Sequence, residues 1–281
     1  GMKKVMVVSL LLILAALCVM LLGLRSQEES AAGIQRPVLL LAQRDTGAYF
    51  MQLRQGILKA LEEQNCTLST QIVDPAAMTD VLWGGIEYSG VLIYIQDETL
   101  RRQTLRSARE QGMPIALIDA HEEGVPSVEQ DGAQYAALAS GAAAKAERVI
   151  CLGGSEPLRK AAKSVLRSRW LDAQSVDPGA ASCAVMALDE ETAVRLLQEK
   201  SEGQWTQPLI LVNPGEGAAS WLETGHVHAV VLPSPYATGY IAASQALWNK
   251  NGQGYRAPAF VVTPENMYDA QNVKLVFPLL Y

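Results

Sequence analysis

The feature that most constrains the fold is a regular alternation of short apolar runs with helical patterns, which begins near residue 38 and continues to residue 250. The runs are apolar almost throughout, as is typical of parallel strands whose two faces are both covered by helices. They are expected at residues 38–43, 68–73, 91–95, 115–119, 149–152, 184–188, 209–213 and 227–232. This order predicts an α/β fold built on open, doubly wound parallel sheets.

The stretches between these runs carry helical signals. In residues 49–63 the side chains of Leu53, Ile57 and Leu61 recur on one stripe. Asp97 and Asp131 each stand where a helix begins, as N-cap residues do. The helices are therefore predicted at residues 49–63, 97–111, 131–146, 189–199 and 235–250.

The N-terminal segment predicts the compartment. Lys3 and Lys4 precede an apolar run over residues 5–24, which as a helix would span about 30 Å, the thickness of a bilayer core. Because the lysines stand before the run, the positive-inside bias places the N-terminus in the cytoplasm and the rest of the chain outside. We expect an uncleaved single-pass anchor followed by a polar linker at residues 25–36. A cleaved signal peptide and a lipoprotein acylated at Cys18 stay open as alternatives.

Composition excludes several classes of function. The net charge of −6 and the pI near 5.2 argue against nucleic acid as a partner. The spacing of Cys66, Cys151 and Cys183 matches no zinc pattern. Because Cys151 and Cys183 lie in apolar strand-like runs, we expect both to be buried free thiols, with a disulfide between them as the alternative. His226 and His228 have no evident third ligand, and no nucleophile is paired with a base. We therefore expect no metal, no cofactor and no enzymatic activity.

Candidate ligand-binding residues follow the ends of the expected strands, where ligands of open α/β sheets bind. Aromatic rings can cover the C–H faces of a sugar, while charged and amide groups bind its hydroxyls. Such a set favours a small polyhydroxylated ligand, although a cap or core role is the alternative for residues such as Asp131 and Phe50. The candidates are Arg44, Asp45, Tyr49, Phe50, Tyr94, Asp119, His121, Asp131, Asn213 and Tyr236.

Several segments together resemble a known family. The first strand, ligand loop and long helix of that family are similar to PVLLLAQRDTGAYFMQLRQGILKALEEQNCTL. Its third strand is similar to SGVLIYIQDE, and its fourth strand with the crossing into the second lobe is similar to MPIALIDAHEEGVPSVEQDG. Its closing pattern is similar to LETGHVHAVVLPSPYATGYIAASQALWNKNGQGYRAPAFVVTPENM. On these segments the chain resembles the type I periplasmic binding proteins, in particular the ribose- and galactose-type sugar-binding proteins of bacterial ABC importers.

The resemblance implies two lobes joined by three crossings, with a ligand cleft between them and a hinge motion that closes it. Lobe 1 would comprise residues 37–125 and 234–260, and lobe 2 residues 126–233 and 261–281. The chain departs from the family pattern where Ala120 follows Asp119 in place of arginine and where Gly132 follows Asp131 in place of asparagine. Asn213 and Pro233 replace a family carboxylate and glutamine, and the second lobe is expected to lack one βα unit between residues 153 and 226.

The resemblance implies an extracytoplasmic solute-binding protein that delivers a carbohydrate or related polyhydroxylated ligand to an ABC permease. The alternative is a membrane-tethered sensory module that acts on a membrane receptor or kinase. The third possibility is a family member that has lost small-ligand binding, because several of the ligand-binding residues of the family are replaced in this chain.

Overall fold

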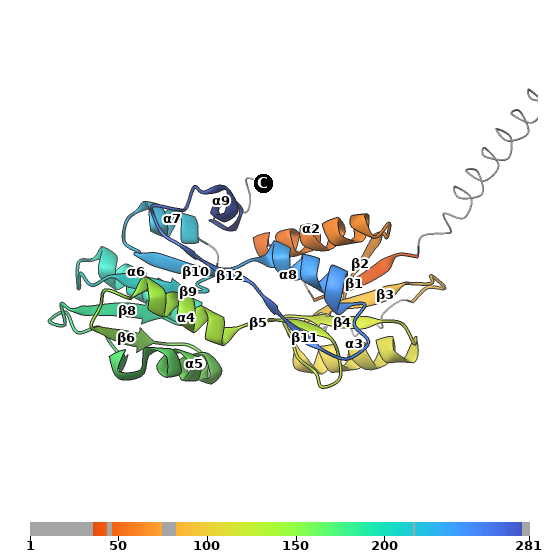
Figure 1. The fold of residues 1–281 in the computed structure, drawn as a ribbon, viewed down its shortest axis with the longest axis horizontal. Coiled ribbons are helices and arrows are strands. Elements are labelled where there is room, and N and C mark those ends of the chain that lie inside the picture. Colours follow the sequence, from red (N-terminus) through yellow and green to blue (C-terminus); the bar gives the residue numbers. More distant parts are fainter. Residues whose placement is uncertain (1–35, 44–46, 75–82, 216, 277–281) are drawn as a thin grey trace, which may run out of the picture.

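The computed structural model describes residues 36–43, 47–74, 83–215 and 217–276, and these form two lobes that lie side by side (Figure 1). Each lobe is built on one six-stranded sheet. The strand order is β11-β5-β4-β3-β1-β2 in the first sheet and β12-β10-β9-β8-β6-β7 in the second. The α/β fold with two doubly wound lobes is therefore confirmed.

Lobe 1 contains an all-parallel sheet with helices on both faces. Its elements, in chain order, are β1 (Val38–Ala42), α2 (Ala48–Glu63), β2 (Leu68–Ile72), β3 (Gly90–Tyr94), α3 (Glu98–Glu110), β4 (Ile115–Ile118), β5 (Ser127–Gln130), α8 (Pro235–Ile241), a π-helical turn (Ala242–Ala246) and β11 (Gly254–Ala257).

Lobe 2 repeats this arrangement, except that its edge strand β12 runs antiparallel to β10. Its elements are α4 (Gly132–Ala142), β6 (Arg148–Leu152), α5 (Glu156–Leu166), a 3-10 turn (Arg167–Arg169), β7 (Trp170–Asp172), β8 (Cys183–Ala187), α6 (Glu190–Ser201), β9 (Leu209–Val212), α7 (Ala218–Glu223), β10 (Ala229–Pro233), β12 (Ala259–Val262) and α9 (Ala270–Val276).

Strand β1 illustrates why these runs are apolar at every position. Leu40 and Ala42 pack on one face of the sheet with residues of α2 and the π-helical turn. Leu39 and Leu41 pack on the other face with Leu105 of α3. All four are fully buried, because successive strand residues point to opposite faces and both faces are covered.

The chain crosses between the lobes three times, and in each crossing a single residue separates the two elements. Asp131 separates β5 from α4, Ser234 separates β10 from α8, and Pro258 separates β11 from β12. The backbone N–H of Ser234 donates to the carbonyl of Pro258 (3.1 Å), which joins two of the crossings.

Two expected lobe boundaries need correction. Residues 127–130 belong to lobe 1, because β5 pairs with β4 through Leu117 and Ser127. Residues 259–260 belong to lobe 2, because β12 pairs with β10 through Pro233 and Ala259. Sequence reasoning misplaced both boundaries because the two strands are short and lie directly beside a crossing.

We expected lobe 2 to lack one βα unit, and this expectation is wrong as far as the strand of that unit is concerned. The second sheet has six strands because the short strand β7 pairs with β6. No helix lies between β7 and β8, where residues 173–182 form turns. Only the helix of that unit is therefore missing.

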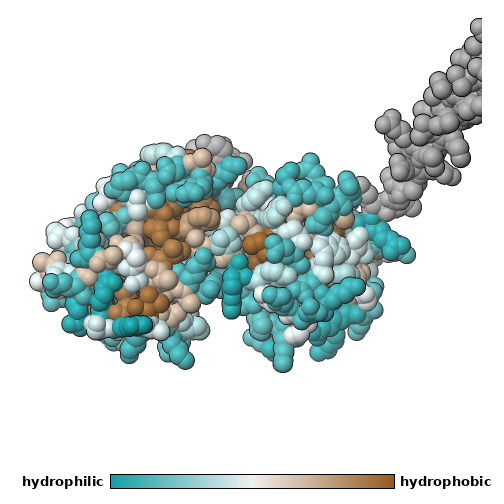
Figure 2. Space-filling view, in the orientation of Figure 1, coloured by the Kyte–Doolittle hydropathy of each residue, from teal (hydrophilic) through white to brown (hydrophobic). Residues whose placement is uncertain are grey.

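The three cysteines beyond residue 36 are free thiols, and Cys151 and Cys183 are buried in neighbouring strands. Burial raises the pKa of the Cys151 thiol to about 12, so the thiol stays protonated at neutral pH. The expected anchor at residues 1–24 lies outside the described residues, and among the described helices none has the length and apolarity needed to span a membrane. Figure 2 shows that hydrophobic residues on the displayed face gather mainly over lobe 2.

Candidate functional site

The carboxyl ends of the lobe 1 strands bring several of the expected residues together. Tyr94 ends β3, Asp119 follows β4, and Tyr49 lies in the first turn of α2, which follows β1. The rings of Tyr49 and Tyr94 are nearly parallel, with centroids 6.0 Å apart and an interplanar angle of 14°. Phe50 stacks on the same Tyr94 ring at 6.2 Å.

A hydrogen-bonded network is centred on the half-buried carboxylate of Asp119. The phenol of Tyr49 donates a short hydrogen bond to Oδ2 of Asp119. The side-chain amide of Gln130 donates to Oδ1 of Asp119 (3.0 Å) and to the Tyr49 hydroxyl (3.1 Å). The phenol of Tyr135 in turn donates to Oε1 of Gln130 (2.5 Å). Both carboxylate oxygens of Asp119 therefore have partners from this chain.

Burial sets the electrostatics of the network. It raises the pKa of Asp119, although the hydrogen bonds from Tyr49 and Gln130 act in the opposite direction. Burial and the nearby charge of Asp119 also raise the pKa of Tyr49 and of Tyr135. Both phenols are thus hydrogen-bond donors across the physiological pH range.

Asp119 and Asn213 occupy matching backbone positions in the two lobes. Each directly follows a central strand, β4 or β9, and each has a positive φ, 53° for Asp119 and 45° for Asn213. Asp and Asn tolerate this left-handed conformation better than most residues do. The presence of Asp and Asn at these two positions can therefore be explained by backbone conformation as well as by ligand binding.

Lobe 2 presents a second loop cluster at the carboxyl ends of β6 and β8. Asp189 accepts hydrogen bonds from the backbone amides of Gly154 and of Thr192, the latter at 2.7 Å. Burial alone would raise the pKa of Asp189, but these hydrogen bonds hold it below its ordinary value. Arg159 donates to the carbonyl of Gly153 (2.9 Å) and to Asp172 (2.6 Å), so its guanidinium holds the loop after β6.

Other expected site residues have structural contacts that account for them. Phe50 is buried in the lobe 1 core, and Asp131 caps α4 by accepting from the amide of Ala133 (3.0 Å). His121 is exposed and contacts Glu129 (3.0 Å), in a surface cluster apart from the network. Tyr236 is 41% exposed at the start of α8, and no hydrogen bond given by the described residues joins it to Asp119. Arg44 and Asp45 lie outside the described residues.

Sequence reasoning missed two members of the network, Gln130 and Tyr135. Gln130 is the last residue of β5, a strand of the first sheet that the sequence pattern did not predict. Tyr135 lies four residues after the helix cap Asp131, within a helix that the alanine-rich composition made look purely structural. The signal that could have found both residues is their position on either side of a crossing.

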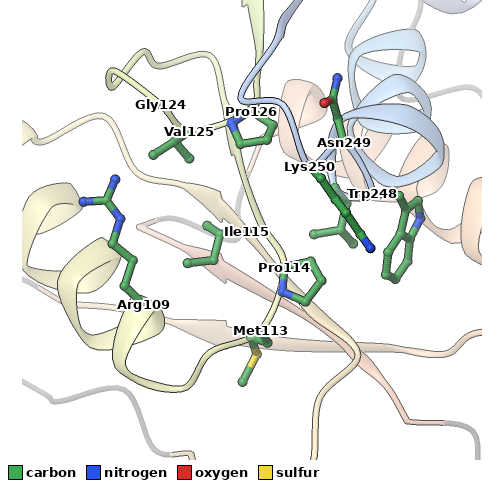
Figure 3. Close-up of a pocket in the computed structure, with 11 residues that line it drawn as sticks. Arg109, Met113, Pro114, Ile115, Gly124, Val125, Pro126, Trp248, Asn249 and Lys250 are labelled. Carbon is green, nitrogen blue, oxygen red and sulfur yellow. The ribbon is translucent and has the colours of Figure 1, made fainter.

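A separate pocket of about 280 Å³ lies at the opposite, amino-terminal end of the first sheet (Figure 3). Its walls come from the start of β4, the turn before β5 and the segment after the π-helical turn. Apolar groups such as Pro114, Val125 and Trp248 line it, and Arg109 and Lys250 approach it from opposite sides. None of the residues expected from the sequence lines this pocket.

The described residues contain no group of three or more His, Cys, Asp or Glu side chains that could hold a metal ion. His226 and His228 lie just before β10, which begins at Ala229.

Comparisons with known proteins match at the level of structure. No family model and no curated protein matches the sequence. A solved structure described as a periplasmic ribose ABC transporter from Conexibacter woesei has a TM-score of 0.68 and 15% identity, covering 86% of this chain and 97% of its own. An ABC transporter solute-binding protein from Agrobacterium vitis bound with α-D-tagatopyranose has a TM-score of 0.61 and 16% identity, covering 85% of this chain and 98% of its own. A mutant XylFII–LytSN complex matches with a TM-score of 0.65 and 18% identity, covering 83% of this chain and 99% of its own.

These matches establish the fold of the type I periplasmic binding proteins, and they confirm the fold that the resemblance implied. The solved structures that share it include carbohydrate-binding components of ABC transporters.

Proposed function

We propose that this chain is an extracytoplasmic solute-binding protein whose ligand is a carbohydrate or a related polyhydroxylated molecule. The observation that carries the proposal is the convergence of Tyr49, Tyr94 and Asp119 at the carboxyl end of the first sheet. Ligands of open parallel sheets bind at this end of the strands. In a two-lobe fold the ligand would contact lobe 2 through Asn213 and the loops that follow β6 and β8.

The chemistry of the site suits an uncharged polar ligand. The aromatic rings of Tyr49 and Tyr94 offer apolar surface to sugar C–H groups, and the half-buried carboxylate of Asp119 accepts hydrogen bonds from hydroxyls. Because the guanidinium beside Asp119 is replaced by Ala120, the site offers no fixed cation at that position. Two of the structural neighbours are described as solute-binding proteins, which favours binding over catalysis.

Thermal unfolding of the full chain in a mild detergent tests the proposal. The panel contains D-ribose, D-xylose, D-galactose, D-tagatose, myo-inositol and ribonucleosides. A ligand present at about 100 times its dissociation constant should stabilise the fold by roughly 2.7 kcal/mol. Tyr94→Ala should remove the shift produced by that ligand, whereas Tyr240→Phe, which alters a contact with Glu63 on α2, should keep it. A panel without any shift would exclude this function and favour a chain that keeps the fold without binding a small molecule.

We further propose that residues 1–24 anchor the protein in the cell membrane with the N-terminus in the cytoplasm. Delivery of the ligand to an ABC permease is then the leading role. Detection of a mature N-terminus beyond residue 24 in protein purified from membranes would exclude the anchor.

A sensory role is the second candidate, since one structural neighbour is described as a complex with a second protein, LytSN. A retained anchor would also keep the binding lobes beside a membrane receptor. Crosslinking in native membranes separates the roles, because an importer role predicts crosslinks to a permease and a sensory role predicts crosslinks to a receptor.

A further inference from the structure

A side-chain hydrogen bond crosses between the lobes at the first crossing. Gln130 ends β5 in lobe 1, and Tyr135 lies on α4 in lobe 2. The Tyr135 ring is 5% exposed and packs among the core residues of lobe 2, so its position is fixed by that lobe. Only Asp131 separates β5 from α4, and a rotation of the lobes about this crossing would change the distance between the two side chains.

The direction of every hydrogen bond in the network follows from its chemistry. An ionised carboxylate only accepts, so the nitrogen of the Gln130 amide faces Asp119 and its oxygen faces Tyr135. Both amide hydrogens of Gln130 are used, one by Asp119 and one by the Tyr49 hydroxyl. The amide group therefore cannot turn toward a new partner without giving up its bond to Asp119 or to Tyr135.

We propose that Gln130 and Tyr135 are positioning residues that restrain the angle between the lobes at the first crossing, and that this restraint is released when the Gln130 amide is replaced at Asp119 by a new partner. The second half of this inference rests on the proposed function, because the new partner would be a ligand hydroxyl. Each oxygen of Asp119 accepts one hydrogen bond from the network, and the proposal commits to the pose in which a ligand hydroxyl takes the place of the Gln130 amide at Oδ1. When the amide of Gln130 leaves Asp119, its oxygen moves as well, and the bond to Tyr135 is lost.

A second contact between the lobes uses different groups. The side-chain amide of Gln52 on α2 donates to the backbone carbonyl of Lys274 on α9 (2.5 Å). Neither group belongs to the Asp119 network. Loss of the Tyr135 bond would thus leave this second contact between the lobes in place.

Amide hydrogen exchange of the full chain in detergent, without added ligand, tests the restraint. Exchange is measured by mass spectrometry on peptides that cover residues 131–135. Tyr135→Phe removes only the hydroxyl, and Gln130→Met keeps the length of the side chain without its polar atoms. Tyr135→Phe should accelerate exchange in these peptides roughly 3- to 10-fold, as expected for the loss of one hydrogen bond, and Gln130→Met, which removes three, should accelerate it at least as much. Tyr240→Phe is the matched control, since it removes a phenol–carboxylate bond of 2.6 Å within lobe 1, and it should leave these peptides unchanged.

Asp119→Asn tests the release without any ligand. An asparagine is neutral and has a single acceptor oxygen, so the charge-assisted bonds that Asp119 accepts from Tyr49 and Gln130 are weakened. If the occupancy of Asp119 controls the link, this variant should accelerate the same peptides to a similar extent. Unchanged exchange in Tyr135→Phe and Gln130→Met would overturn the restraint, and unchanged exchange in Asp119→Asn alone would overturn the release.

These outcomes are independent of the sugar panel. If no sugar shifts the melting temperature, the proposed function fails while the exchange rates still decide the restraint. If D-ribose or another panel member binds, Tyr135→Phe should bind it roughly 3- to 10-fold more tightly, because binding no longer has to break the link. Equal affinity would contradict the coupling. Melting curves of all variants, read by circular dichroism, verify that each one is folded.

Discussion

The α-carbon of Gly56 in α2 lies directly against the backbone carbonyl of Tyr236 in α8. A Cβ at position 56 would come within 1.9 Å of that carbonyl oxygen. Gly239 mirrors this contact, since a Cβ there would lie 2.1 Å from the carbonyl oxygen of Leu53. The two glycines let the helices approach closely and so connect the segment after the second crossing to the first helix of lobe 1.

Gly56→Ala should therefore lower the free energy of unfolding by about 2–3 kcal/mol, because the helices must separate to admit the methyl group. Gly141→Ala in α4 is the control, since a Cβ there meets nothing within 4 Å. That change should stabilise the protein by about 0.5–1 kcal/mol, as expected when alanine replaces glycine inside a helix. Urea denaturation followed by circular dichroism measures both, and similar effects at the two positions would contradict the close-packing argument.

The raised pKa of Asp119 predicts a pH dependence of stability. Since the folded-state pKa lies above the ordinary value of 3.8, the folded protein holds this proton more tightly than the unfolded chain does. The contribution of this proton to the free energy of unfolding is thus fully present below pH 3.8 and is lost as the pH rises through the raised pKa of Asp119. In Asp119→Asn this component is absent, so the stability of the wild type minus that of the variant should fall with rising pH. A difference that stays constant or rises above pH 4 would show that Asp119 is not desolvated.

Much of the fold was predictable because its signals are local. The central strands, such as β1 and β9, are buried on both faces and stand out as apolar runs. The edge strands were harder to predict: β7 has three residues, and β11 (Gly254–Ala257) is partly exposed, so neither has a continuous apolar signal. Their positions are fixed by pairing with strands far away in the sequence, which a local pattern does not contain.

The location of the candidate site could be predicted from the sequence, but the hydrogen-bond partners of its residues could not. Tyr49, Tyr94 and Asp119 could be placed from the rule that ligands bind at the carboxyl ends of parallel strands. What the sequence could not indicate is that Asp119 already has its own partners. That fact depends on Gln130 and Tyr135, which are brought to the carboxylate by β5 and by the crossing that follows it.

Asp189 should be more important for stability than the other aspartate caps. It accepts from the amide of Thr192 in its own helix and also from Gly154 in the loop after β6, whereas Asp97 accepts from Leu100 alone. Asp97→Ala should cost about 1 kcal/mol at pH 7, and Asp189→Ala about 2 kcal/mol.

The pH dependence checks the cause of that difference. Since the pKa of Asp189 is held below its ordinary value, its contribution is present above pH 3.8 and is lost as the pH falls through the lowered pKa. Denaturant titrations of both variants at pH 7 and pH 3 measure the effect. An Asp189→Ala cost that does not decrease toward low pH would rule out the role of its charge.

The positive φ of Asn213 allows its backbone role to be separated from a ligand-binding role. Its backbone N–H donates to the carbonyl of Val231 (2.8 Å), so the left-handed turn is fixed by the sheet whatever the side chain does. Asn213→Gly should keep the free energy of unfolding nearly unchanged, whereas Asn213→Ala should lower it by about 1 kcal/mol. If the side chain also binds ligand, both variants should lose most of the thermal shift given by the active sugar of the panel. Denaturant titration and thermal shift on the same samples give both results, and a full shift retained in Asn213→Gly would assign Asn213 to the backbone alone.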